Sequence, residues 1–502
     1  MKPEEIGFQL DLLSHFSSDQ IGLVTGDTSY SFACLDGLVK EREAWFKSIG
    51  VEPYDLAVVI GENGLSMWVS MVALVRLGAC ISPLNARLSA REIHEILNIA
   101  KPKIEVYCGG SEANVRHAAL RQTALIPGNL VGGDRFHIEG IPKEHTFPKD
   151  RLQYGVILYT SGTSGTPKGV VWSRSFFAGL GKSFAERAGL GKEDCMLAVA
   201  PFSHGLGLSS MFAALLAGTS LYIMPRFDPD RAAALIISGK ISVITGVPLL
   251  FRKLADAMKG GLPEDADISI KSMTSGGAPL TLELKKLVEK VFSITLNNGY
   301  GLTECTPISS TLGTKTPSFD PKSGVLSVGK VIEPLKVRIE KQGQVLFHYE
   351  VGEIVVENHC GFLGYLGDEI ATIDMFASDG ALKTGDLGYL NEDGELFIVG
   401  RSKDVIIRSG FNIYPGEVEA VLQSHSAVRA AAVIADVIDG EERLIAFVEL
   451  CPGHEASAEE ILAHTADKLA PYKKPESLHF MNKLPRSQNG KILKRDLKAI
   501  SL

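Results

Sequence analysis

Apolar and polar runs alternate regularly between residues 56 and 107. Residues 56–60 and 79–83 are apolar runs of strand length, and residues 68–77 between them have the length of a helix. Strands that alternate with helices are typical of βαβ units in a parallel sheet. Strand-like runs recur at residues 155–158, 221–224, 242–245, 272–275 and 293–297. The pattern therefore predicts a large α/β domain.

The pattern changes at Val325 to short strands separated by turns. Gln342-Gly343 is a turn signal inside this region. The strand-like runs around it are residues 337–340, 345–348 and 352–357. They predict a small β-barrel-like subdomain at about residues 315–400, built as an antiparallel sheet or a closed barrel.

These patterns predict two domains, and 502 residues are more than one hydrophobic core usually holds. Residues 1–400 are expected to form an N-terminal domain of mixed and parallel sheets with flanking helices, including the β-rich subdomain. Residues 401–502 have a mixed pattern of their own and predict a small α+β C-terminal domain. Residues 401–404 are the expected connection.

Composition and charge narrow the function classes. The chain has 51 Lys and Arg against 59 Asp and Glu, and the net charge of −8 argues against nucleic acid as a partner. Seven cysteines without a C-x-x-C pair favour a reduced cytoplasmic location and no zinc site. Glu4 and Glu5 stand where a signal peptide needs an apolar core.

One uncharged segment, residues 196–225, has the length of a membrane span. Pro201, His204 and several glycines interrupt it. We therefore expect a buried strand, loop, helix and strand, and no membrane span.

A loop rich in glycine and hydroxyl side chains follows the apolar run that ends at Leu158. Glycines let backbone N–H groups turn toward an anion, hydroxyls add donors, and a lysine adds a mobile positive charge. The loop predicts a phosphate site; the alternative is a flexible surface turn. It is not a Walker P-loop, because Pro167 precedes Lys168 and Gly169 follows it. The candidate phosphate-binding residues are Thr160, Ser161, Gly162, Thr163, Ser164, Gly165, Thr166 and Lys168.

Further polar clusters follow along the chain. They are Ala200-Pro201-Phe202-Ser203-His204-Gly205, Ser275-Gly276-Gly277-Ala278-Pro279, Asn298-Gly299-Tyr300-Gly301-Leu302-Thr303-Glu304, Thr384-Gly385-Asp386, Arg401-Ser402-Lys403, and a segment at residues 484–492 that contains Lys491. In order and spacing, these clusters and the loop resemble the motifs of the adenylate-forming superfamily, which includes acyl-CoA synthetases, peptide-synthetase adenylation domains and luciferases. The resemblance extends from about Ser31 to Leu493, with Ser164 where many members have Thr.

The resemblance implies a nucleotide site in the N-terminal domain. Tyr300 offers an aromatic face to the purine, Thr303 a hydroxyl to phosphate, and Glu304 a hard oxygen ligand to Mg²⁺. Thr303 and Glu304 are thereby candidates for the catalytic machinery as well. Without the resemblance, Glu304 is an acid at a helix N-terminus. The residues implied to bind nucleotide here are Gly276, Gly277, Ala278, Asn298, Gly299, Tyr300, Gly301 and Thr303.

The clusters near the domain boundary have implied roles too. Asp386 can accept two hydrogen bonds from a ribose diol, and otherwise lies in an ordinary β-turn. Arg401 matches an arginine that contacts ribose or phosphate. Lys403 falls at the hinge about which a mobile C-terminal domain swivels, and otherwise is a solvated turn lysine.

The remaining candidates concern the acid and the thiol. His204 matches a residue that gates the carboxylate; alone it would be a core histidine. Lys491 resembles the catalytic lysine that contacts both the carboxylate and the α-phosphate, although most terminal lysines only add solubility. Ser409 and Gly410 match a face that lines a pantetheine tunnel after the domain pivots.

The implied activity is that of an AMP-forming acid–thiol ligase that uses ATP, Mg²⁺ and coenzyme A. The alternatives are an acyl carrier protein as acceptor, a luciferase-like oxygenase, and an inactive nucleotide-binding relative. The gate cluster has no aspartate for a substrate ammonium group. The expected pocket segments contain no Arg or Lys, which favours a neutral fatty, branched or aryl acid. These segments are residues 205–208, 246–249, 275–277 and 298–302.

Overall fold

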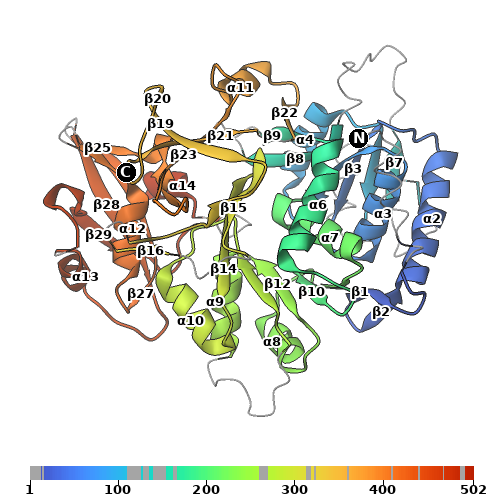
Figure 1. Ribbon diagram of the computed structural model, residues 1–502, viewed down its shortest axis with the longest axis horizontal. Coiled ribbons are helices and arrows are strands. Elements are labelled where there is room, and N and C mark those ends of the chain that lie inside the picture. The colour runs from blue at the N-terminus through green and yellow to red at the C-terminus, as the bar shows by residue number, and fades with distance from the viewer. Residues whose placement is uncertain are drawn as a thin grey trace.

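The computed structural model has two large sheets, a smaller antiparallel sheet and a C-terminal α+β unit (Figure 1). It describes residues 13, 16–109, 126–127, 135–138, 154–161, 167–258, 269–312, 318–321, 324–358, 361–408, 411–438, 441–466, 468–486 and 492–501.

The first large sheet has eight strands. They are β3 (Leu56–Gly61), β4 (Cys80–Asn85), β5 (Ile104–Tyr107), β6 (Ile126–Pro127), β7 (Arg135–Ile138), β8 (Tyr154–Ser161), β9 (Pro167–Ser173) and β22 (Phe362–Tyr365). Their order is β22-β9-β8-β4-β3-β5-β7-β6. β3, β4, β5 and β8 are parallel, whereas β7, β9 and β22 pair in the antiparallel sense.

The second large sheet has nine strands. They are β1 (Ile21–Thr25), β2 (Thr28–Ser31), β10 (Cys195–Ala198), β11 (Ser220–Ile223), β12 (Val243–Gly246), β13 (Ser272–Ser275), β14 (Leu296–Leu302), β15 (Cys305–Ser310) and β18 (Lys330–Val331). The order is β18-β15-β14-β13-β12-β10-β11-β1-β2, and the strands from β14 to β1 in this order are parallel.

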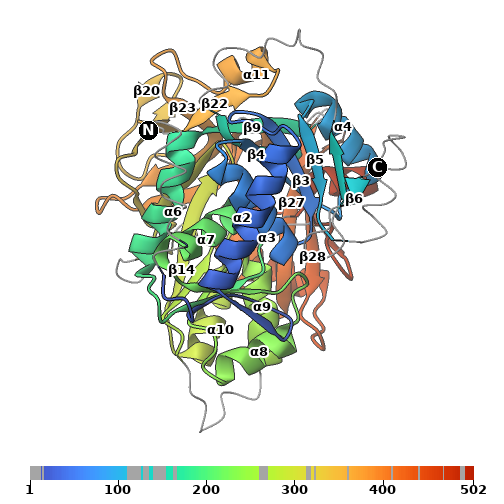
Figure 2. The ribbon, with the colours of Figure 1, turned by 90° about the vertical axis from the view of Figure 1, so that its right-hand side faces the viewer.

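Helices cover both faces of the sheets. The main core lies between the two sheets and contains side chains of α2 (Phe32–Ser48), α3 (Leu65–Arg76), α6 (Arg174–Ala188) and α7 (Gly205–Ala217). Figure 2 shows α2 beside α3, and α6 beside α7. The outer faces are covered by α4 (Ala90–Ala100) on the first sheet and by α8 (Pro229–Ile237), α9 (Pro248–Ala257) and α10 (Leu282–Phe292) on the second. Every residue of β3 is buried because it is covered on both faces.

The helix ends follow local sequence signals. α6 begins after Ser173, whose hydroxyl accepts a hydrogen bond from the Phe176 N–H at 3.2 Å. It ends at Gly189, where φ is 59°, a conformation that glycine adopts without strain. α7 begins directly after His204, so the expected strand, loop, helix and strand at residues 196–225 is confirmed by β10, α7 and β11.

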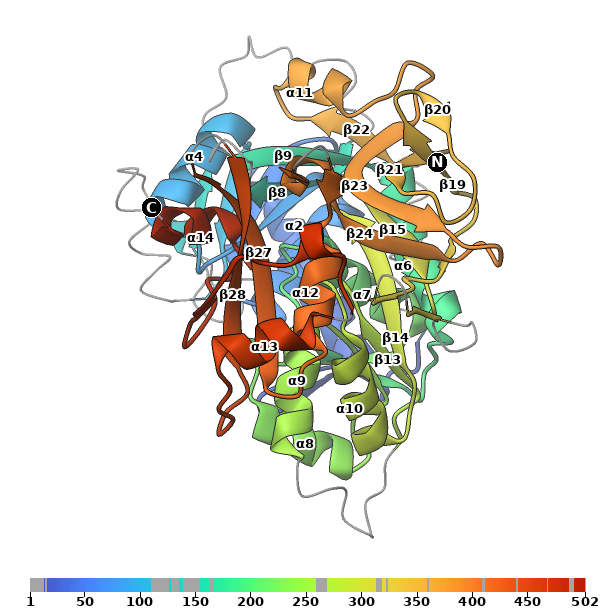
Figure 3. The same cartoon turned by 90° about the vertical axis from the view of Figure 1, so that its left-hand side faces the viewer.

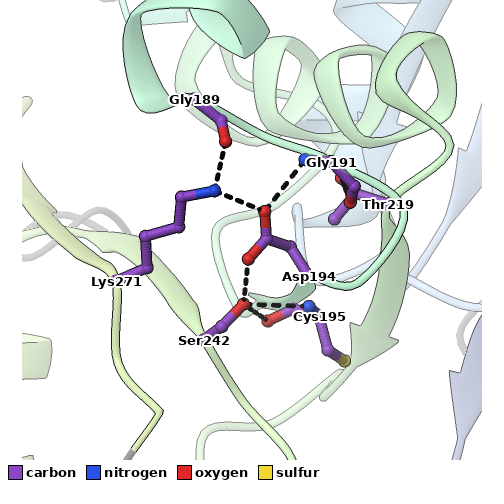
Figure 4. A network of polar contacts seen from close by, with 7 residues as sticks. All are labelled: Gly189, Gly191, Asp194, Cys195, Thr219, Ser242 and Lys271. Atoms are coloured by element: carbon purple, nitrogen blue, oxygen red, sulfur yellow. Dashed lines mark hydrogen bonds and ion pairs between the residues drawn. The ribbon is translucent and has the colours of Figure 1, made fainter.

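A buried aspartate connects the amino-terminal ends of the strands in the second sheet. The Asp194 carboxylate accepts hydrogen bonds from the Gly191 N–H, the Ser242 hydroxyl and the Lys271 ammonium, each at 2.9 Å (Figure 4). Ser242 also accepts a hydrogen bond from the Cys195 N–H at 3.0 Å. This network fixes the starts of β10, β12 and β13 relative to one another, at the sheet edge opposite their carboxyl ends.

The expected β-rich region forms an open antiparallel sheet rather than a closed barrel. Its strands are β19 (Lys336–Lys341), β20 (Gln344–Val345), β21 (Gly352–Glu357), β23 (Leu382–Leu390) and β24 (Leu396–Arg401). The order β20-β19-β21-β23-β24 leaves β20 and β24 at the edges. A two-stranded pair, β16 (Phe319–Asp320) and β17 (Val325–Leu326), precedes the sheet, and the short helix α11 (Glu369–Asp374) lies within the region.

The C-terminal α+β unit has its own core. Its elements are the 3₁₀ turn η3 (Ser402–Asp404), β25 (Ile406–Arg408), β26 (Phe411–Ile413), α12 (Pro415–Gln423), β27 (Val428–Ile438), β28 (Glu441–Leu450), α13 (Ala458–His464), η4 (Pro471–Lys473), β29 (Ser477–Phe480) and α14 (Lys494–Ser501). Figure 3 shows α12 along β27. A side chain at Gly416 would approach the Val399 carbonyl to 2.5 Å, so α12 begins directly against β24.

The expected α/β architecture is confirmed. No helix in the described ranges is long and apolar enough to cross a bilayer.

Candidate active site

The carboxyl ends of parallel strands bring several expected clusters to one edge of the second sheet. Ser275 pairs with Gly246 on one side and with Asn298 on the other. The Gly276 N–H donates to the Gly246 carbonyl at 3.0 Å. The cluster that contains His204 follows β10, which lies in the same parallel arrangement. Loops at this edge are the usual ligand site of such sheets.

Asn63 holds the loop before His204 in place. Its Nδ2 donates to the Ala200 carbonyl at 2.8 Å, and its Oδ1 accepts from the Phe202 N–H at 2.9 Å. Asn63 belongs to the first sheet's β3–α3 connection, so it ties the two sheets together beside the candidate site. No motif in the sequence indicates Asn63, because its partner Phe202 is 139 residues away.

His204 is largely buried at the start of α7. Burial lowers the pKa of its imidazole below 6.5. The adjacent Gly205 lies against Trp172, since a side chain there would come within 3.3 Å of the indole. His204, directly before the first turn of α7, is therefore a neutral group and adds no fixed charge to the site at neutral pH.

The glycine-rich cluster after β13 lies beside the next strand, β14. Gly277 has a φ of 77°, which a residue with a side chain rarely adopts. A methyl group on Gly276 would lie 3.5 Å from the Gly299 carbonyl. The Asn298 amide is buried and donates to the Ser327 carbonyl at 3.1 Å. This side chain holds β14 in place. In the neighbouring glycine cluster Gly276 is buried and Gly277 is exposed, so the backbone at Gly277 is open to a flat ring.

Asp386 is the centre of a polar network at the same site. Its Oδ2 accepts a hydrogen bond from the Tyr300 hydroxyl at 2.7 Å, and its Oδ1 lies 3.0 Å from Arg401 Nε. Burial first, and then the Asp386 charge, raise the pKa of the Tyr300 phenol well above its usual value. The phenol therefore remains a donor, and the carboxylate keeps unused lone pairs for a ligand.

The expected turn at Thr384-Gly385-Asp386 is wrong in its local structure. These residues lie inside β23, where the pairing with β21 is irregular and Gly385 has a φ of 68°. The Thr384 hydroxyl accepts from the Asp386 N–H at 3.1 Å. The glycine and the hydroxyl produced a turn signal because they make the same local bend within the strand.

Glu304 does not lie at the start of a helix, which was the alternative to a metal-binding role. No helix begins there, because Thr303 and Glu304 form the turn between β14 and β15. The Trp172 indole N–H donates to the Thr303 carbonyl at 2.7 Å. The Tyr365 hydroxyl donates to Glu304 Oε1 at 2.6 Å. The turn is thus held from two sides by the β9–β22 ribbon.

Lys168 reaches the same place from β9. Its Nζ lies 4.8 Å from the centre of the Tyr365 ring. One phenol therefore contacts both residues, Lys168 through its ring and Glu304 through its hydroxyl. Tyr365 and Trp172 were not indicated by any motif, because strands distant in sequence contribute them.

Several candidates lie outside the described residues. The structure describes Thr160, and Ser161 only as the end of β8. Lys403 is exposed in η3. Arg401, which directly precedes η3, is brought to Asp386. The binding roles of all the candidates, Ala278, Gly301 and Lys403 included, stay predictions. The candidates outside the described residues are Gly162, Thr163, Ser164, Gly165, Thr166, Ser409, Gly410 and Lys491.

The donor set at Glu304 fits Mg²⁺ only together with a substrate. Within the described residues, no cluster of three or more His, Cys, Asp or Glu could hold a metal. Mg²⁺ typically takes one or two carboxylates, substrate phosphate oxygens and water. One carboxylate, with Oε1 hydrogen-bonded to Tyr365, and the neighbouring Thr303 hydroxyl match that requirement.

Comparison with known proteins identifies the family of the chain. The family model described as AMP-binding enzyme matches residues 15–366, and the model described as AMP-binding enzyme C-terminal domain matches residues 417–491. A 2-succinylbenzoate–CoA ligase of Geobacillus sp. (strain WCH70) is 33% identical over 497 residues, which cover 96% of this chain and 95% of the relative. 4-Coumarate–CoA ligase 3 of Oryza sativa subsp. japonica is 30% identical and covers 95% and 88%.

Solved structures with the same fold include an O-succinylbenzoate coenzyme A synthetase from Bacillus subtilis in complex with AMP. It has a TM-score of 0.79 and 27% identity, and 98% of each chain is covered. An amide bond synthetase from Marinactinospora thermotolerans has a TM-score of 0.84, 21% identity and full coverage of both chains (100% each), and it supports the fold alone. The chain therefore belongs to the AMP-binding enzyme family, the adenylate-forming family that its motifs indicated, and is an AMP-forming acid–thiol ligase of the acyl-CoA synthetase type.

Proposed function

We propose that this enzyme joins a carboxylic acid to AMP, with release of pyrophosphate, and then transfers the acyl group to the thiol of coenzyme A. The observation that carries the proposal is the convergence of two contacts on β14 and its turn. Tyr300 donates a hydrogen bond to Asp386, which pairs with Arg401. Glu304 accepts a hydrogen bond from Tyr365, whose ring contacts Lys168. Groups suited to ribose and groups suited to triphosphate are thus held within five residues of one strand and turn.

The charges suit the first half-reaction. Attack of a carboxylate on the α-phosphorus brings two anions together, so the transition state needs positive charge near the phosphoryl oxygens. Lys168 lies on β9 directly after the expected phosphate loop. Lys491 lies outside the described residues, and the resemblance assigns it a second positive charge for the same phosphate. Bound Mg²⁺ would neutralise charge on the phosphates and polarise them. Glu304 and Thr303 would hold this ion, while Asp386 orients the nucleotide through its ribose.

We propose that the acid is an aryl acid without a second carboxylate. Among the described residues, the sheet edge at Gly246, Gly276 and Gly277 carries no charged side chain that could pair with a second carboxylate, and the exposed Gly277 leaves room beside it for a ring. His204 is uncharged at neutral pH because burial lowers its pKa, so it cannot pair with a second carboxylate. The named relatives activate 2-succinylbenzoate and 4-coumarate, two aryl acids of which the first has an additional carboxylate.

The test is release of AMP from ATP and Mg²⁺ over a panel of acids, with and without acceptor. The panel contains 4-coumarate, benzoate, 2-succinylbenzoate and a medium-chain fatty acid, and the acceptors are coenzyme A and a phosphopantetheinyl carrier protein. We expect rapid AMP release only with coenzyme A and a monocarboxylic aryl acid, together with the thioester. A preference for 2-succinylbenzoate would contradict the substrate proposal. A preference for the carrier would contradict the acceptor, and no acid-dependent AMP with any acid would contradict the reaction.

A further inference from the structure

Tyr365 connects two oppositely charged residues that the reaction needs. Its hydroxyl donates to Glu304 Oε1 at 2.6 Å, and its ring centre lies 4.8 Å from Lys168 Nζ. Lys168 and Glu304, both in the described part of the chain, form no direct ion pair with each other. A phenol suits this place, because its ring face attracts a cation while its hydroxyl satisfies a carboxylate.

The position of Tyr365 is fixed by its surroundings. β22 pairs with β9 so that Tyr365 lies opposite Val170. The Tyr365 N–H donates to the Thr372 hydroxyl at 2.8 Å, which ties the strand to α11. The Phe362 ring packs edge-on against the Tyr365 ring, with centroids 5.2 Å apart. Because strand, helix and ring contacts fix Tyr365, its side chain can in turn fix the positions of Glu304 and Lys168.

The direction of the hydrogen bond is also fixed. A tyrosine phenol ordinarily ionises only at about pH 10, and an ionised carboxylate can only accept, so the Tyr365 hydroxyl is the donor in its 2.6 Å bond to Glu304. The phenol therefore stays protonated at neutral pH and always donates. One oxygen of Glu304 is then taken by the phenol, and the plane of its carboxylate is set, so that the other oxygen has a defined direction.

Without the phenol, two consequences follow from simple electrostatics. Glu304 loses the donor that orients it, so a cation at its free oxygen is held less tightly. If the ring is absent as well, Lys168 and Glu304 are free to approach and pair. Such a pair neutralises both charges before a nucleotide binds.

We propose that Tyr365 is a positioning residue that orients the Glu304 carboxylate and keeps the Lys168 ammonium from pairing with it, so that both charges stay available to magnesium nucleotide. The inference rests on the proposed function for the roles of Glu304 and Lys168. It assigns to Tyr365 no contact with the reacting atoms.

Two substitutions separate the two parts of this role. Tyr365→Phe keeps the ring beside Lys168 and removes only the donor to Glu304. Tyr365→Leu removes both. Tyr107→Phe is a matched control, because the Tyr107 hydroxyl donates to a buried carboxylate, Glu105 Oε2, at 2.7 Å on β5, in a different part of the fold.

The experiment measures binding rather than turnover. Mn²⁺ affinity is measured by electron paramagnetic resonance in the presence of a saturating non-hydrolysable ATP analogue, and metal-free ATP affinity is measured by calorimetry in EDTA. Tyr365→Phe should weaken Mn²⁺ binding roughly 10- to 100-fold and leave metal-free ATP binding unchanged. Tyr365→Leu should weaken both, the second by roughly 3- to 30-fold. Tyr107→Phe should alter neither.

The outcomes separate this inference from the proposed function. Glu304→Gln is included to test the carboxylate itself. If it weakens Mn²⁺ binding but Tyr365→Phe, with an unchanged circular dichroism spectrum, does not, the role of Tyr365 is overturned and the function stands. If Glu304→Gln binds Mn²⁺ like the wild type while acid-dependent AMP release continues, the metal role of Glu304 and the Tyr365 inference both fail, and the ligase reaction stands. Equal effects of Tyr365→Phe and Tyr365→Leu on metal-free ATP would overturn the part that concerns Lys168.

Discussion

Asp386 and Arg401 lie opposite each other on β23 and β24, and Arg401 Nε is 3.0 Å from Asp386 Oδ1. Arg401 is the last residue of β24 and directly precedes η3 (Ser402–Asp404). The Ser402 hydroxyl also donates to the Gly385 carbonyl at 3.1 Å. The proposed ribose anchor is therefore joined to the start of the proposed hinge, so nucleotide contacts and domain position are expected to influence one another.

Replacement of Asp386 by alanine should remove discrimination at the ribose. Hydrogen bonds to a charged acceptor contribute about 1.5–3 kcal/mol each, so Asp386→Ala should weaken ATP binding roughly 10- to 100-fold. The wild type should bind ATP more tightly than 3′-deoxyATP, and Asp386→Ala should bind both equally in calorimetry. Asp320→Ala is the control, since Asp320 accepts from Tyr389 in a similar bond. A variant that keeps the wild-type preference for ATP would contradict the assignment.

His204 should make stability depend on pH. Its pKa in the folded protein lies below 6.5 because of burial, so below that pH the unfolded chain binds a proton that the folded chain does not. The His204 contribution to stability is therefore complete above pH 6.5 and is lost as the pH falls through the folded pKa. Urea unfolding at pH 7.5 and 5.5 should show a smaller loss for His204→Gln than for the wild type. The exposed His94, replaced by Gln, should leave the loss unchanged.

The Asp194 network should contribute to stability and not to chemistry. Asp194 is buried, and Asp194→Asn removes the charge that three donors share, so we expect a loss of about 2 kcal/mol in the free energy of unfolding. The exposed pair between Arg231 and Asp27 is the control, and Asp27→Asn should have no measurable effect. Urea titration measures both. An equal loss in the free energy of unfolding for the two substitutions would contradict the claim that the buried network stabilises the fold more than an exposed ion pair does.

Much of the fold was predictable because burial on both faces leaves a simple trace in the sequence. β3, β13 and β21 appear at or within one residue of their expected positions. Apolar or small residues fill β3 and β13, and β21 has a continuous buried apolar run, Ile354–Val356. The strand expected at residues 345–348 is shorter and begins one residue earlier, as β20 (Gln344–Val345). Its residues are exposed at the edge of the sheet, where they have little to pack against.

The candidate site was predictable only in part. Local motifs indicated Lys168, Glu304, Asp386 and Arg401, because each lies beside glycines or turn residues. The partners that join them could not be found this way: Tyr365 lies 61 residues from Glu304 and Trp172 lies 131 from Thr303. Such contacts depend on strand order, which a single sequence does not specify locally.

The hinge assignment predicts a separation of the two half-reactions. Lys403→Pro restricts the backbone at η3, so adenylation should continue while thioester formation falls. Formation of acyl-AMP in a single turnover and transfer to coenzyme A are measured separately. The control is Lys240→Ala at an exposed position, which tests for a general effect of losing a lysine. Lys383→Pro is not used, because Lys383 lies in β23, where proline would disturb the sheet. If both half-reactions decrease together, Lys403 is not the hinge.

The most direct test of the central claim is acid-dependent exchange of labelled pyrophosphate into ATP. We expect exchange in the wild type with an aryl acid and Mg²⁺, and none without acid. Exchange should decrease by ~100-fold or more in Lys491→Ala, since removal of one preorganised charge commonly adds about 3 kcal/mol to the barrier. No exchange with any acid, or unchanged exchange in Lys491→Ala, would contradict the claim that this site joins an acid to AMP.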